Sequence, residues 1–336
     1  MIIALDAMGG DNAPQSVVDG CKQYLKENPG DRVRLFGKAE VVAPLIEGSE
    51  NIELIDCPEV IDMEEEPMLA VRRKQNSSLM RGLKDVKEGA SAAFVSAGST
   101  GALFLGSMVT LRLLKGIPRP ALAPVLPGTK GPFLLIDSGA NADCQPEYLE
   151  KFGLMGAAYM SAVMGVKNPR VGLVNIGVED VKGSKLYRDA FGLMKAQGAY
   201  NFAGNCEARE IQKGEFDVVV ADGFTGNVIL KYAEGFAGCL MHEIKAEVMS
   251  SLRGKLGGLL LKPAFANIKR KLNTEEYGGA PLVGVNGVVV KAHGSSGAYA
   301  IKRTLEQAHL MVEGGLTDKI RQGLETTQLR TKENEQ

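Results

Sequence analysis

Residues 217–231 read DVVVADGFTGNVILK, and this stretch contains the local pattern on which the fold prediction rests. The valines from Val218 to Val220 predict a strand that is buried on both faces, as strands in parallel sheets are. Asp222 and Gly223 end the strand, and a long helical pattern is expected from Val228. A strand, a turn of small residues and a helix start together form one half of a βαβ unit.

The turn between this strand and this helix has two interpretations. The first turn of a helix has unpaired N–H groups and the positive end of the helix dipole, so it can bind a phosphate or carboxylate. Thr225 and Asn227 would add side-chain donors, and Lys231 follows about one turn later. The alternative is an ordinary turn in which Asp222 or Thr225 caps the helix.

The same alternation of strand and helix runs through the chain and predicts an α/β fold. Short apolar runs indicate further strands at residues 1–5, 32–36, 52–55, 92–95, 133–136, 171–174 and 285–290. Helical patterns separate most of them, which is typical of a three-layer α/β/α sandwich with a largely parallel sheet. No Ser/Gly-rich linker interrupts the pattern. We therefore expect one α/β domain over residues 1–336.

Composition excludes several classes of protein. The formal net charge is −1, tryptophan is absent and aromatic residues make up 6% of the 336 residues. Nucleic acid is therefore not an expected partner. Five scattered cysteines without a C-x-x-C pair favour a reducing compartment, and hence a cytoplasmic location. No apolar run is long enough to span a bilayer.

Polar turns follow six of the predicted strands, where open α/β sheets bind their ligands. Their Gly, Ser, Thr and Asn residues, together with Asp, Lys and His, predict one continuous polar cleft. The six turns span residues 6–12, 96–101, 137–141, 175–182, 222–227 and 291–296.

Several common catalytic motifs are absent from the sequence. It contains no G-x-G-x-x-G, no Walker-type G-x-x-x-x-G-K-[ST] and no G-x-S-x-G elbow. His242 lacks a second histidine at zinc-ligand spacing, so we expect no metal and no cofactor. Cys144 lies near the turn at residues 137–141, but nothing close to it in sequence lowers its pKa. The cleft therefore suits a phosphate-bearing ligand and a substrate that supplies its own nucleophile.

Residues 248–272 do not resemble the rest of the chain. They contain six basic residues, no acidic residue and many leucines, and Pro263 is expected to split them into two short helices. Apolar side chains with only basic neighbours favour contact with an anionic membrane surface or an acidic partner. The alternative is a helical hairpin packed on its own domain or on a dimer mate. The candidate contact residues are Leu252, Arg253, Lys255, Leu256, Leu259, Leu260 and Lys262.

Six motifs, in order along residues 1–315, resemble those of the bacterial phosphate acyltransferases (PlsX family). They are MIIALDAMGGDNAP at 1–14, SAGSTGA at 96–102, DSGAN at 137–141, EAR at 207–209, DGFTGN at 222–227 and KAHGSS at 291–296. The resemblance implies a fold similar to isocitrate/isopropylmalate dehydrogenases and phosphotransacetylases. It also implies a homodimer at the inner face of the cell membrane, with the basic hairpin protruding from the catalytic domain.

The reaction that the resemblance implies is the reversible transfer of a long-chain acyl group from acyl carrier protein to inorganic phosphate. The acyl phosphate would then serve a membrane-bound glycerol-3-phosphate acyltransferase in phospholipid synthesis. Two other functions stay open: a short-chain phosphotransacetylase that uses acyl-CoA, and a non-catalytic scaffold at the membrane. The preferred donor separates the first alternative, and the absence of any turnover would indicate the second.

In the implied mechanism, phosphate attacks the thioester directly, and each turn contributes named residues. The candidate catalytic residues are Lys182, Lys185, Lys291 and His293. The candidate substrate-binding residues are Asp6, Gly9, Asn12, Ser99, Thr100, Gly101, Asp137, Asn141, Asn175, Asp222, Thr225, Gly226 and Asn227. Phosphate is expected at the N–H groups of Ser99 to Gly101 and of Gly226 and Asn227.

Overall fold

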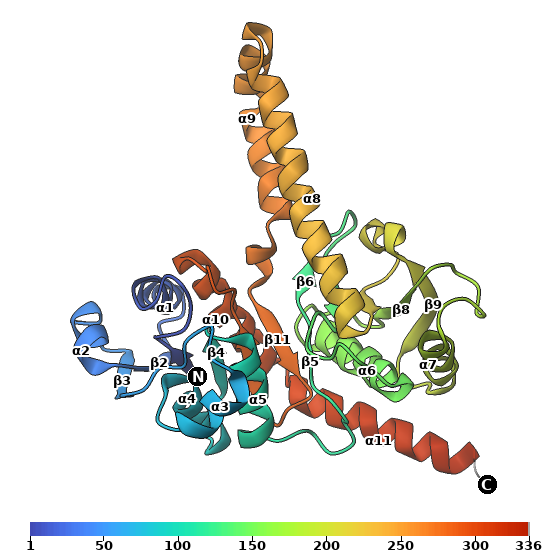
Figure 1. Cartoon of the computed structure of the whole chain (residues 1–336), viewed down its shortest axis with the longest axis horizontal. Coiled ribbons are helices and arrows are strands. Elements are labelled where there is room, and N and C mark those ends of the chain that lie inside the picture. Colours follow the sequence, from blue (N-terminus) through green and yellow to red (C-terminus); the bar gives the residue numbers. More distant parts are fainter. Residues whose placement is uncertain (335–336) are drawn as a thin grey trace.

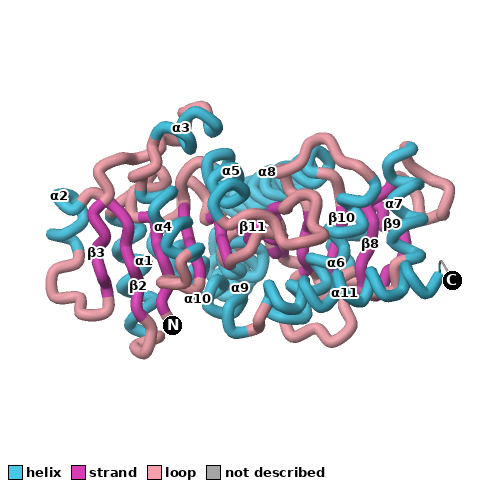
Figure 2. The backbone as a smooth tube through the Cα atoms, turned by 90° about the horizontal axis from the view of Figure 1, so that it is seen from below, coloured by secondary structure: helices cyan, strands magenta, loops and turns pink. Residues whose placement is uncertain are grey.

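The computed structural model describes residues 1–334, with side chains through residue 327, and its strands form two sheets. Figure 2 shows the strands of both sheets side by side, with helices around them. The first sheet has the order β3 (Ile52–Asp56), β2 (Arg32–Gly37), β1 (Ile2–Asp6), β4 (Ala93–Ser96), β12 (Val288–Lys291), β11 (Ala280–Val283), β5 (Ala121–Leu122). The second has the order β6 (Val125–Leu126), β7 (Phe133–Ile136), β10 (Val218–Val220), β8 (Arg170–Asn175), β9 (Asn201–Glu207).

Most strand pairs are parallel, because helices return the chain to the same edge of each sheet. The antiparallel strand pairs are β11 with β12, β11 with β5 and β6 with β7. The predicted α/β class with mainly parallel strands is thus confirmed. The strands divide between two sheets, whereas the sequence pattern indicated one, since local periodicity does not reveal which strands pair.

Helices cover both faces of the first sheet. On one face α1 (Gln15–Glu27) packs against α10 (Ala298–Glu313), and on the other lie α4 (Ser78–Lys87) and α5 (Thr100–Thr110). Alternate residues of one strand serve the two layers: Ile3 and Leu5 face one core, and Ala4 faces the other. Around this sheet lie the short elements α2 (Ala39–Val42), η1 (Ala43–Leu45) and α3 (Pro67–Arg73).

The second sheet shares the core of the first. Residues of α6 (Pro146–Ala162) and α7 (Lys185–Ala196) join those of α1 and α10 in one continuous cluster of buried apolar side chains. The opposite face of this sheet has a separate small core, to which Ile229 and Leu230 of α8 (Gly223–Met249) contribute. The remaining elements are η2 (Ala208–Lys213), η3 (Thr274–Tyr277) and α11 (Leu316–Asn334).

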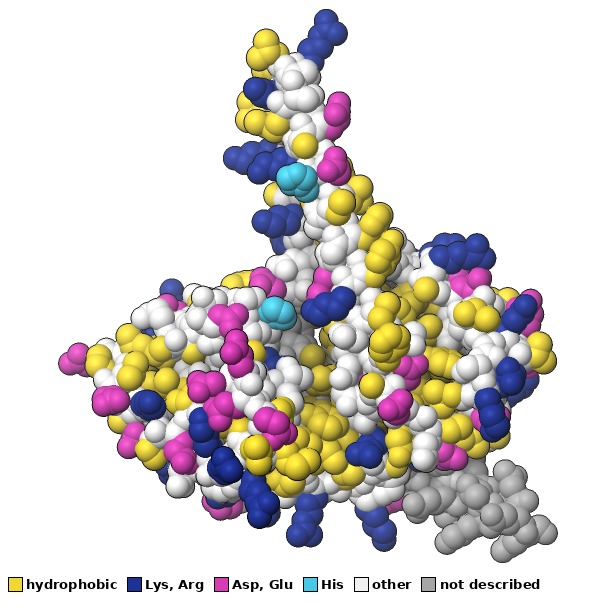
Figure 3. All heavy atoms as spheres, viewed as in Figure 1, with side chains coloured by type: hydrophobic (Ala, Val, Ile, Leu, Met, Phe, Trp, Pro, Cys, Tyr) yellow, Lys and Arg dark blue, Asp and Glu magenta, His cyan; other side chains and the backbone are white. Residues whose placement is uncertain are grey.

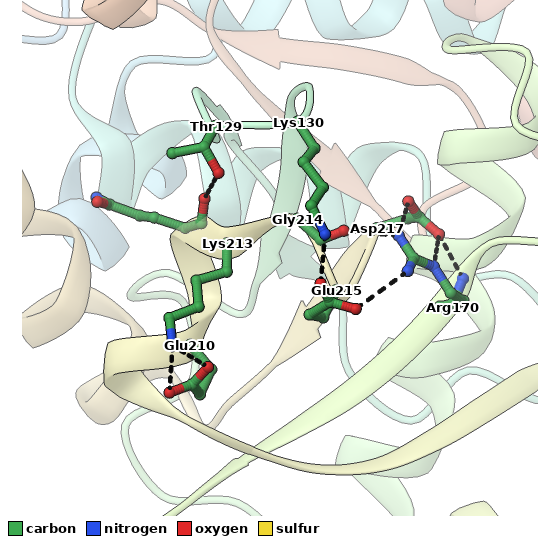
Figure 4. A network of polar contacts seen from close by, with 9 residues as sticks. Thr129, Lys130, Arg170, Glu210, Lys213, Gly214, Glu215 and Asp217 are labelled. Carbon is green, nitrogen blue, oxygen red and sulfur yellow. Dashed lines mark hydrogen bonds and ion pairs between the residues drawn. The ribbon is translucent and has the colours of Figure 1, made fainter.

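A network of ion pairs holds the amino ends of two strands in the second sheet (Figure 4). The Arg170 guanidinium, at the start of β8, donates to both carboxylate oxygens of Asp217 at 3.1 Å. It also donates to the Gly214 carbonyl at 2.9 Å, while Lys130 pairs with Glu215 at 2.5 Å. This network lies at the edge opposite the carboxyl ends of these strands, so its role is structural.

The most prominent feature is a helical hairpin that projects from the body (Figure 1). It consists of α8 and α9 (Leu252–Leu272), which pack along each other and meet at the turn of Ser250 and Ser251. The predicted break at Pro263 is wrong, because α9 continues through that residue. The proline costs one backbone hydrogen bond, but on this exposed helix water can satisfy the freed carbonyl. The hairpin also begins earlier than the predicted residue 248, because its first helix, α8, starts at Gly223.

Candidate active site

Three of the six polar turns meet at the carboxyl ends of β1, β4 and β12, which are neighbouring parallel strands. The Ser96 hydroxyl donates to the Asp6 carboxylate at 2.7 Å. The Asn12 amide donates to the Ser295 carbonyl at 3.0 Å, and the Asp11 N–H donates to the Gly294 carbonyl at 2.8 Å. Residues 6–12, 96–101 and 291–296 therefore form one group, which we call the first loop cluster.

Lys291 is the buried cation of this cluster. Its side chain leaves the end of β12, is only 7% exposed, and its ammonium donates to the carbonyl of Ala97 at 3.0 Å and to that of Ala292. Burial lowers the pKa of Lys291 to about 8, although Asp6 and Asp11 attract the charged form. A cation with a pKa this close to neutrality can both stabilise an anion and release a proton.

Asp6 fixes the geometry around that lysine. Its carboxylate accepts from Ser96 and, at 3.1 Å, from the Met8 N–H, while the Ser96 oxygen accepts from the Gly98 N–H at 3.0 Å. Burial raises the pKa of the Asp6 carboxyl above its ordinary value, and these hydrogen bonds oppose that rise. A Cβ at Gly9 would lie 2.5 Å from the Gly98 nitrogen, so only glycine fits there. Asp6 and Gly9 therefore shape the loops.

The N-terminus of α5 supplies free N–H donors beside the cluster. Ser99 caps the helix by accepting from the Ala102 N–H at 3.4 Å. Thr100 and Gly101 are the first two helical residues, so no carbonyl within the helix can accept from their N–H groups. The predicted donors at Thr100 and Gly101 thus occupy a helix start suited to an anion.

His293 is exposed at the rim of the first loop cluster. Its Nδ1 accepts from the Ser295 N–H at 3.2 Å and lies 2.8 Å from the Ser295 hydroxyl. Because a backbone N–H can only donate, Nδ1 is unprotonated in the neutral ring and the proton resides on Nε2. His293 can therefore offer a donor toward solvent or a substrate.

The turn at residues 222–227 adopts the capping interpretation. Helix α8 begins at Gly223, not Val228, because the Asp222 carboxylate caps it by accepting from the Thr225 N–H at 2.9 Å and the Thr225 hydroxyl at 2.7 Å. The Gly226 N–H donates to the Asp222 carbonyl at 2.9 Å. The prediction that phosphate binds the N–H groups of Gly226 and Asn227 is therefore wrong for Gly226, whose N–H is used inside the helix. Asn227 is one residue further along, where the helix pairs its own N–H groups.

Asp137 and Asn141 hold one loop of the second sheet. The buried Asp137 carboxylate accepts from the N–H groups of Leu122, Ala140 and Asn141 and from the Asn141 side chain, at 2.7 to 3.2 Å. The Asn141 amide also donates to the Pro120 carbonyl at 2.8 Å. Leu122 belongs to the first sheet, so this loop ties the two sheets together beside the site.

The predicted lysines of the second sheet differ in their surroundings. Lys185 is exposed and pairs with Asp189 at 2.5 Å on the surface of α7, away from the buried polar groups. Lys182 is exposed on the loop after β8, and its ammonium has no acidic partner among the described residues. Asn175 supports that loop by donating to the Lys182 carbonyl at 3.1 Å.

Each sheet and the helices around it form one lobe of the molecule. The loops of the two sheets border a hollow between these lobes. Ala140 packs against the core beneath α5, and Gly139 lies next to the Asn227 side chain. Figure 3 shows this face hollowed between the lobes, with hydrophobic side chains gathered in the hollow. The turns at residues 137–141 and 222–227 therefore lie against each other, as the contacts of Gly139 with Asn227 and of Gly223 with Asn141 indicate.

Two participants were not among the named candidate residues, although Ser96 begins the predicted turn at residues 96–101. Ser96 joins Asp6 to Gly98, and Tyr187 of α7 donates to the Asp222 carboxylate at 2.5 Å. Ser96 directly follows a predicted strand, which is a usable signal. Tyr187 lies in the first turn of the amphipathic helix α7, 35 residues from Asp222, so no local pattern marks it.

Comparison with known proteins decides the family. A family model described as "Fatty acid synthesis protein" matches residues 1–319. A phosphate acyltransferase of Clostridium tetani is 48% identical over 328 residues, which cover 96% of this chain and 98% of that protein. A phosphate acyltransferase of Clostridium acetobutylicum is 46% identical over 329 residues, covering 97% and 99%. The chain belongs to the phosphate acyltransferase family.

Solved structures show where the acyltransferase fold recurs. A phosphotransacetylase from Streptococcus pyogenes aligns with a TM-score of 0.62 at 14% identity, over 94% of each chain. A branched-chain phosphotransacylase from Enterococcus faecalis aligns with a TM-score of 0.60 at 15% identity, over 93% of this chain and 99% of that one. At such low identity these neighbours establish the fold of the acyltransferase alone.

Proposed function

We propose that this acyltransferase moves a long-chain acyl group from acyl carrier protein to inorganic phosphate, reversibly and without a covalent enzyme intermediate. The observation that carries the proposal is the buried Lys291 in the same loop cluster as the free N–H groups of Thr100 and Gly101. Together they offer a cation and two oriented dipoles at one place, which suits a phosphate dianion and the oxyanion of a thioester under attack.

The chemistry of the proposed step balances without a further reactant. A phosphate oxygen attacks the thioester carbonyl carbon, the carbon–sulfur bond breaks, and the thiolate takes a proton as it leaves. The Lys291 ammonium is the proposed source of this proton, and the Nε2–H of His293 is the proposed hydrogen-bond donor to the oxyanion. Burial raises the pKa of Cys144 to about 12, so that side chain stays a thiol at neutral pH, in keeping with direct attack by phosphate.

The test of this function is release of the carrier thiol from palmitoyl-acyl carrier protein, measured with and without phosphate, with palmitoyl-CoA in parallel. We expect release that requires phosphate and is faster from the carrier protein. Faster release from CoA would instead favour a phosphotransacetylase. Release from neither donor would overturn the proposal and leave a binding role for the hairpin.

Lys182 is proposed to assist phosphate from the opposite lobe. Lys182→Ala should lower turnover about tenfold to a hundredfold, since a charged hydrogen bond to phosphate contributes about 1.5–3 kcal/mol. Its exposed side chain predicts no measurable change in the denaturation midpoint. Lys185→Ala should have a smaller effect, because that ammonium is engaged with Asp189. Full activity of Lys182→Ala would remove Lys182 from the mechanism.

We also propose that the hairpin attaches the enzyme to an anionic membrane surface, where the acyl phosphate can reach a membrane-bound glycerol-3-phosphate acyltransferase. No helix in residues 1–334 has the length and apolarity needed to cross a bilayer. Near its outer end, however, the hairpin exposes leucines beside basic residues: Leu252 is 80% exposed and Leu260 82%. Arg253, Lys255 and Lys262 are close in sequence and have no acidic partner among the described residues. This combination suits lipid headgroups and acyl chains.

Leu260→Glu should weaken binding to vesicles containing anionic lipid by at least tenfold. The change removes a leucine whose burial contributes about 1.5–3 kcal/mol, and it adds a charge that the surface repels. Co-sedimentation with vesicles measures the effect. Leu193→Glu, the same substitution at a half-exposed position of α7, is the matched control and should bind as wild type does. Equal binding by the two variants would exclude the hairpin as the attachment site.

We also propose that two copies of the chain form a homodimer. Helix α8 exposes a stripe of large apolar side chains at four-residue spacing, each at least 47% exposed. The stripe consists of Phe224, Val228, Tyr232, Phe236 and Leu240. A single copy leaves these side chains in water, and a second copy that covers them would recover the apolar burial.

A further inference from the structure

A cavity of about 620 Å³ lies at the base of the hairpin, and none of its lining residues belongs to the loops that carry the proposed chemistry. It is open to solvent and is bordered by the end of α6, the last turn of α9, η3 and α10. Its size falls in the range of small-molecule sites. Its lining includes the apolar residues Val163, Met164, Tyr277 and Leu310 and the basic residues Arg270 and Lys271.

The polar groups at the bottom of this cavity are already paired. Tyr159 and Gln307 are almost fully buried, and the Gln307 amide donates to the Tyr159 hydroxyl at 2.8 Å. The Oε1 atom of the same Gln307 amide accepts from the Gly279 N–H at 2.8 Å. A ligand that reaches this depth gains little from polar atoms, so the interior suits an apolar chain.

The charges that line the cavity are not balanced. Arg303 donates to the Glu276 carbonyl and pairs with Glu306. The Glu276 carboxylate accepts from the Tyr299 hydroxyl at 2.8 Å. Arg270 and Lys271, at the end of α9, have no acidic partner among the described residues. The lining thus contains three positive and two negative side chains, a net charge of +1, and the two cations without an ion pair lie beside the apolar residues.

We propose that this cavity binds a single-chain long-chain acyl anion, with the chain against Val163, Met164 and Leu310 and the headgroup at Arg270 and Lys271. Charge complementarity at Arg270 and Lys271 selects this occupant over an uncharged lipid, and the apolar residues beside them suit its chain. The ligand would touch both the hairpin and the body, because α9 joins the body through η3. Such binding does not depend on the proposed reaction.

The test is calorimetric titration of the full chain with decanoate below its micellar concentration, and with decanol as the uncharged match. We expect decanoate to bind at least tenfold more tightly than decanol. The double variant Arg270→Gln/Lys271→Gln should bind decanoate about tenfold more weakly, a loss of about 1.4 kcal/mol. Leu310→Gln, at a position 46% exposed, should also weaken binding.

Two control variants show whether decanoate binds in this cavity or elsewhere on the hairpin. Lys245→Gln removes an exposed charge from α8, outside the cavity lining, and should leave decanoate binding unchanged. Met249→Gln, at an exposed position of α8 outside the cavity lining, should also leave it unchanged. No binding by the wild type, equal binding of decanol, or wild-type affinity in the double variant would each overturn the inference. The last result would mean that the two basic residues only balance the dipole of α9.

Discussion

Lys291→Met should lower turnover by about a hundredfold to a thousandfold, the loss expected when one group that stabilises an oxyanion is removed. The physical reason is burial: in a site from which water is largely excluded, one positive charge has a much larger effect on a developing anion than at the surface. Methionine has a similar shape, so it fills the space of a side chain that is only 7% exposed. Steady-state turnover with phosphate and palmitoyl-acyl carrier protein measures the effect.

Stability is the control for this variant. The change leaves the carbonyls of Ala97 and Ala292 without the lysine donor, but it also removes a charge whose burial is unfavourable. We therefore expect the free energy of unfolding to change by less than about 2 kcal/mol. Unfolding of the variant under the conditions of the turnover measurement would assign Lys291 a structural role instead.

The pH dependence gives an independent measurement of the same lysine. If the ammonium form is required, turnover should fall as the pH rises through about 8, the pKa to which burial lowers Lys291. Lys291→Arg keeps the charge and should move this loss to higher pH. The effect on stability has the opposite sign. The folded pKa of about 8 lies below the ordinary 10.5, so between these two values the unfolded chain binds more protons than the folded one. Lys291 therefore makes the wild type more stable as the pH rises from about 8 to 10.5. An alkaline limb unchanged in Lys291→Arg would contradict the assignment.

Gly226→Ala should destabilise the protein by about 3 kcal/mol, although alanine is the better helix former. A Cβ at this position would lie 1.8 Å from the Asp137 carbonyl oxygen, a backbone atom that cannot rotate away. Either the first turn of α8 or the loop that begins at Asp137 must move. Because Asp137 holds Asn141 and Leu122, we expect turnover to fall as well. Chemical denaturation gives the free energy of unfolding.

Gly235→Ala is the matched control for this prediction. Gly235 lies in the same helix, but a Cβ there would meet nothing within 4 Å. The same substitution should therefore stabilise the chain by about 0.5–1 kcal/mol, because glycine loses more backbone entropy in a helix. Opposite signs for the two variants would establish that contact with Asp137, and not helix propensity, sets the cost. Equal effects would exclude the close approach.

The turn at residues 222–227 shows how much structure a local pattern determines. Val218 to Val220 identified a buried parallel strand, and the structure places β10 in the middle of the second sheet. The Asp-Gly-Phe-Thr segment also contained the capping alternative that the structure adopts. What the segment did not reveal is that Asp222 uses its carboxylate on Thr225 and Tyr187 and so starts the helix early. Tyr187 is brought to Asp222 only by the packing of α7.

The candidate site shows the same division. Strand periodicity and polar strand ends predicted that Asp6, Ser99 and Lys291 lie at one edge of a sheet, and the neighbouring order of β1, β4 and β12 accounts for it. No pattern in the sequence distinguished Lys291 from Lys185. Lys291 is buried at the end of β12, whereas Lys185 pairs with Asp189 on the exposed face of α7. Burial depends on what packs above a residue, and those neighbours come from distant parts of the chain.

The sequence by itself determined the α/β class, the positions of the polar turns and the basic, leucine-rich character of residues 248–272, because each follows from local periodicity and composition. Only the tertiary structure decided that the strands form two sheets, that α9 continues through Pro263 beside α8, and that the hairpin base borders an open cavity. Each of these depends on contacts between segments far apart in the chain. The energy of such contacts outweighs local preferences, and local sequence contains no record of them.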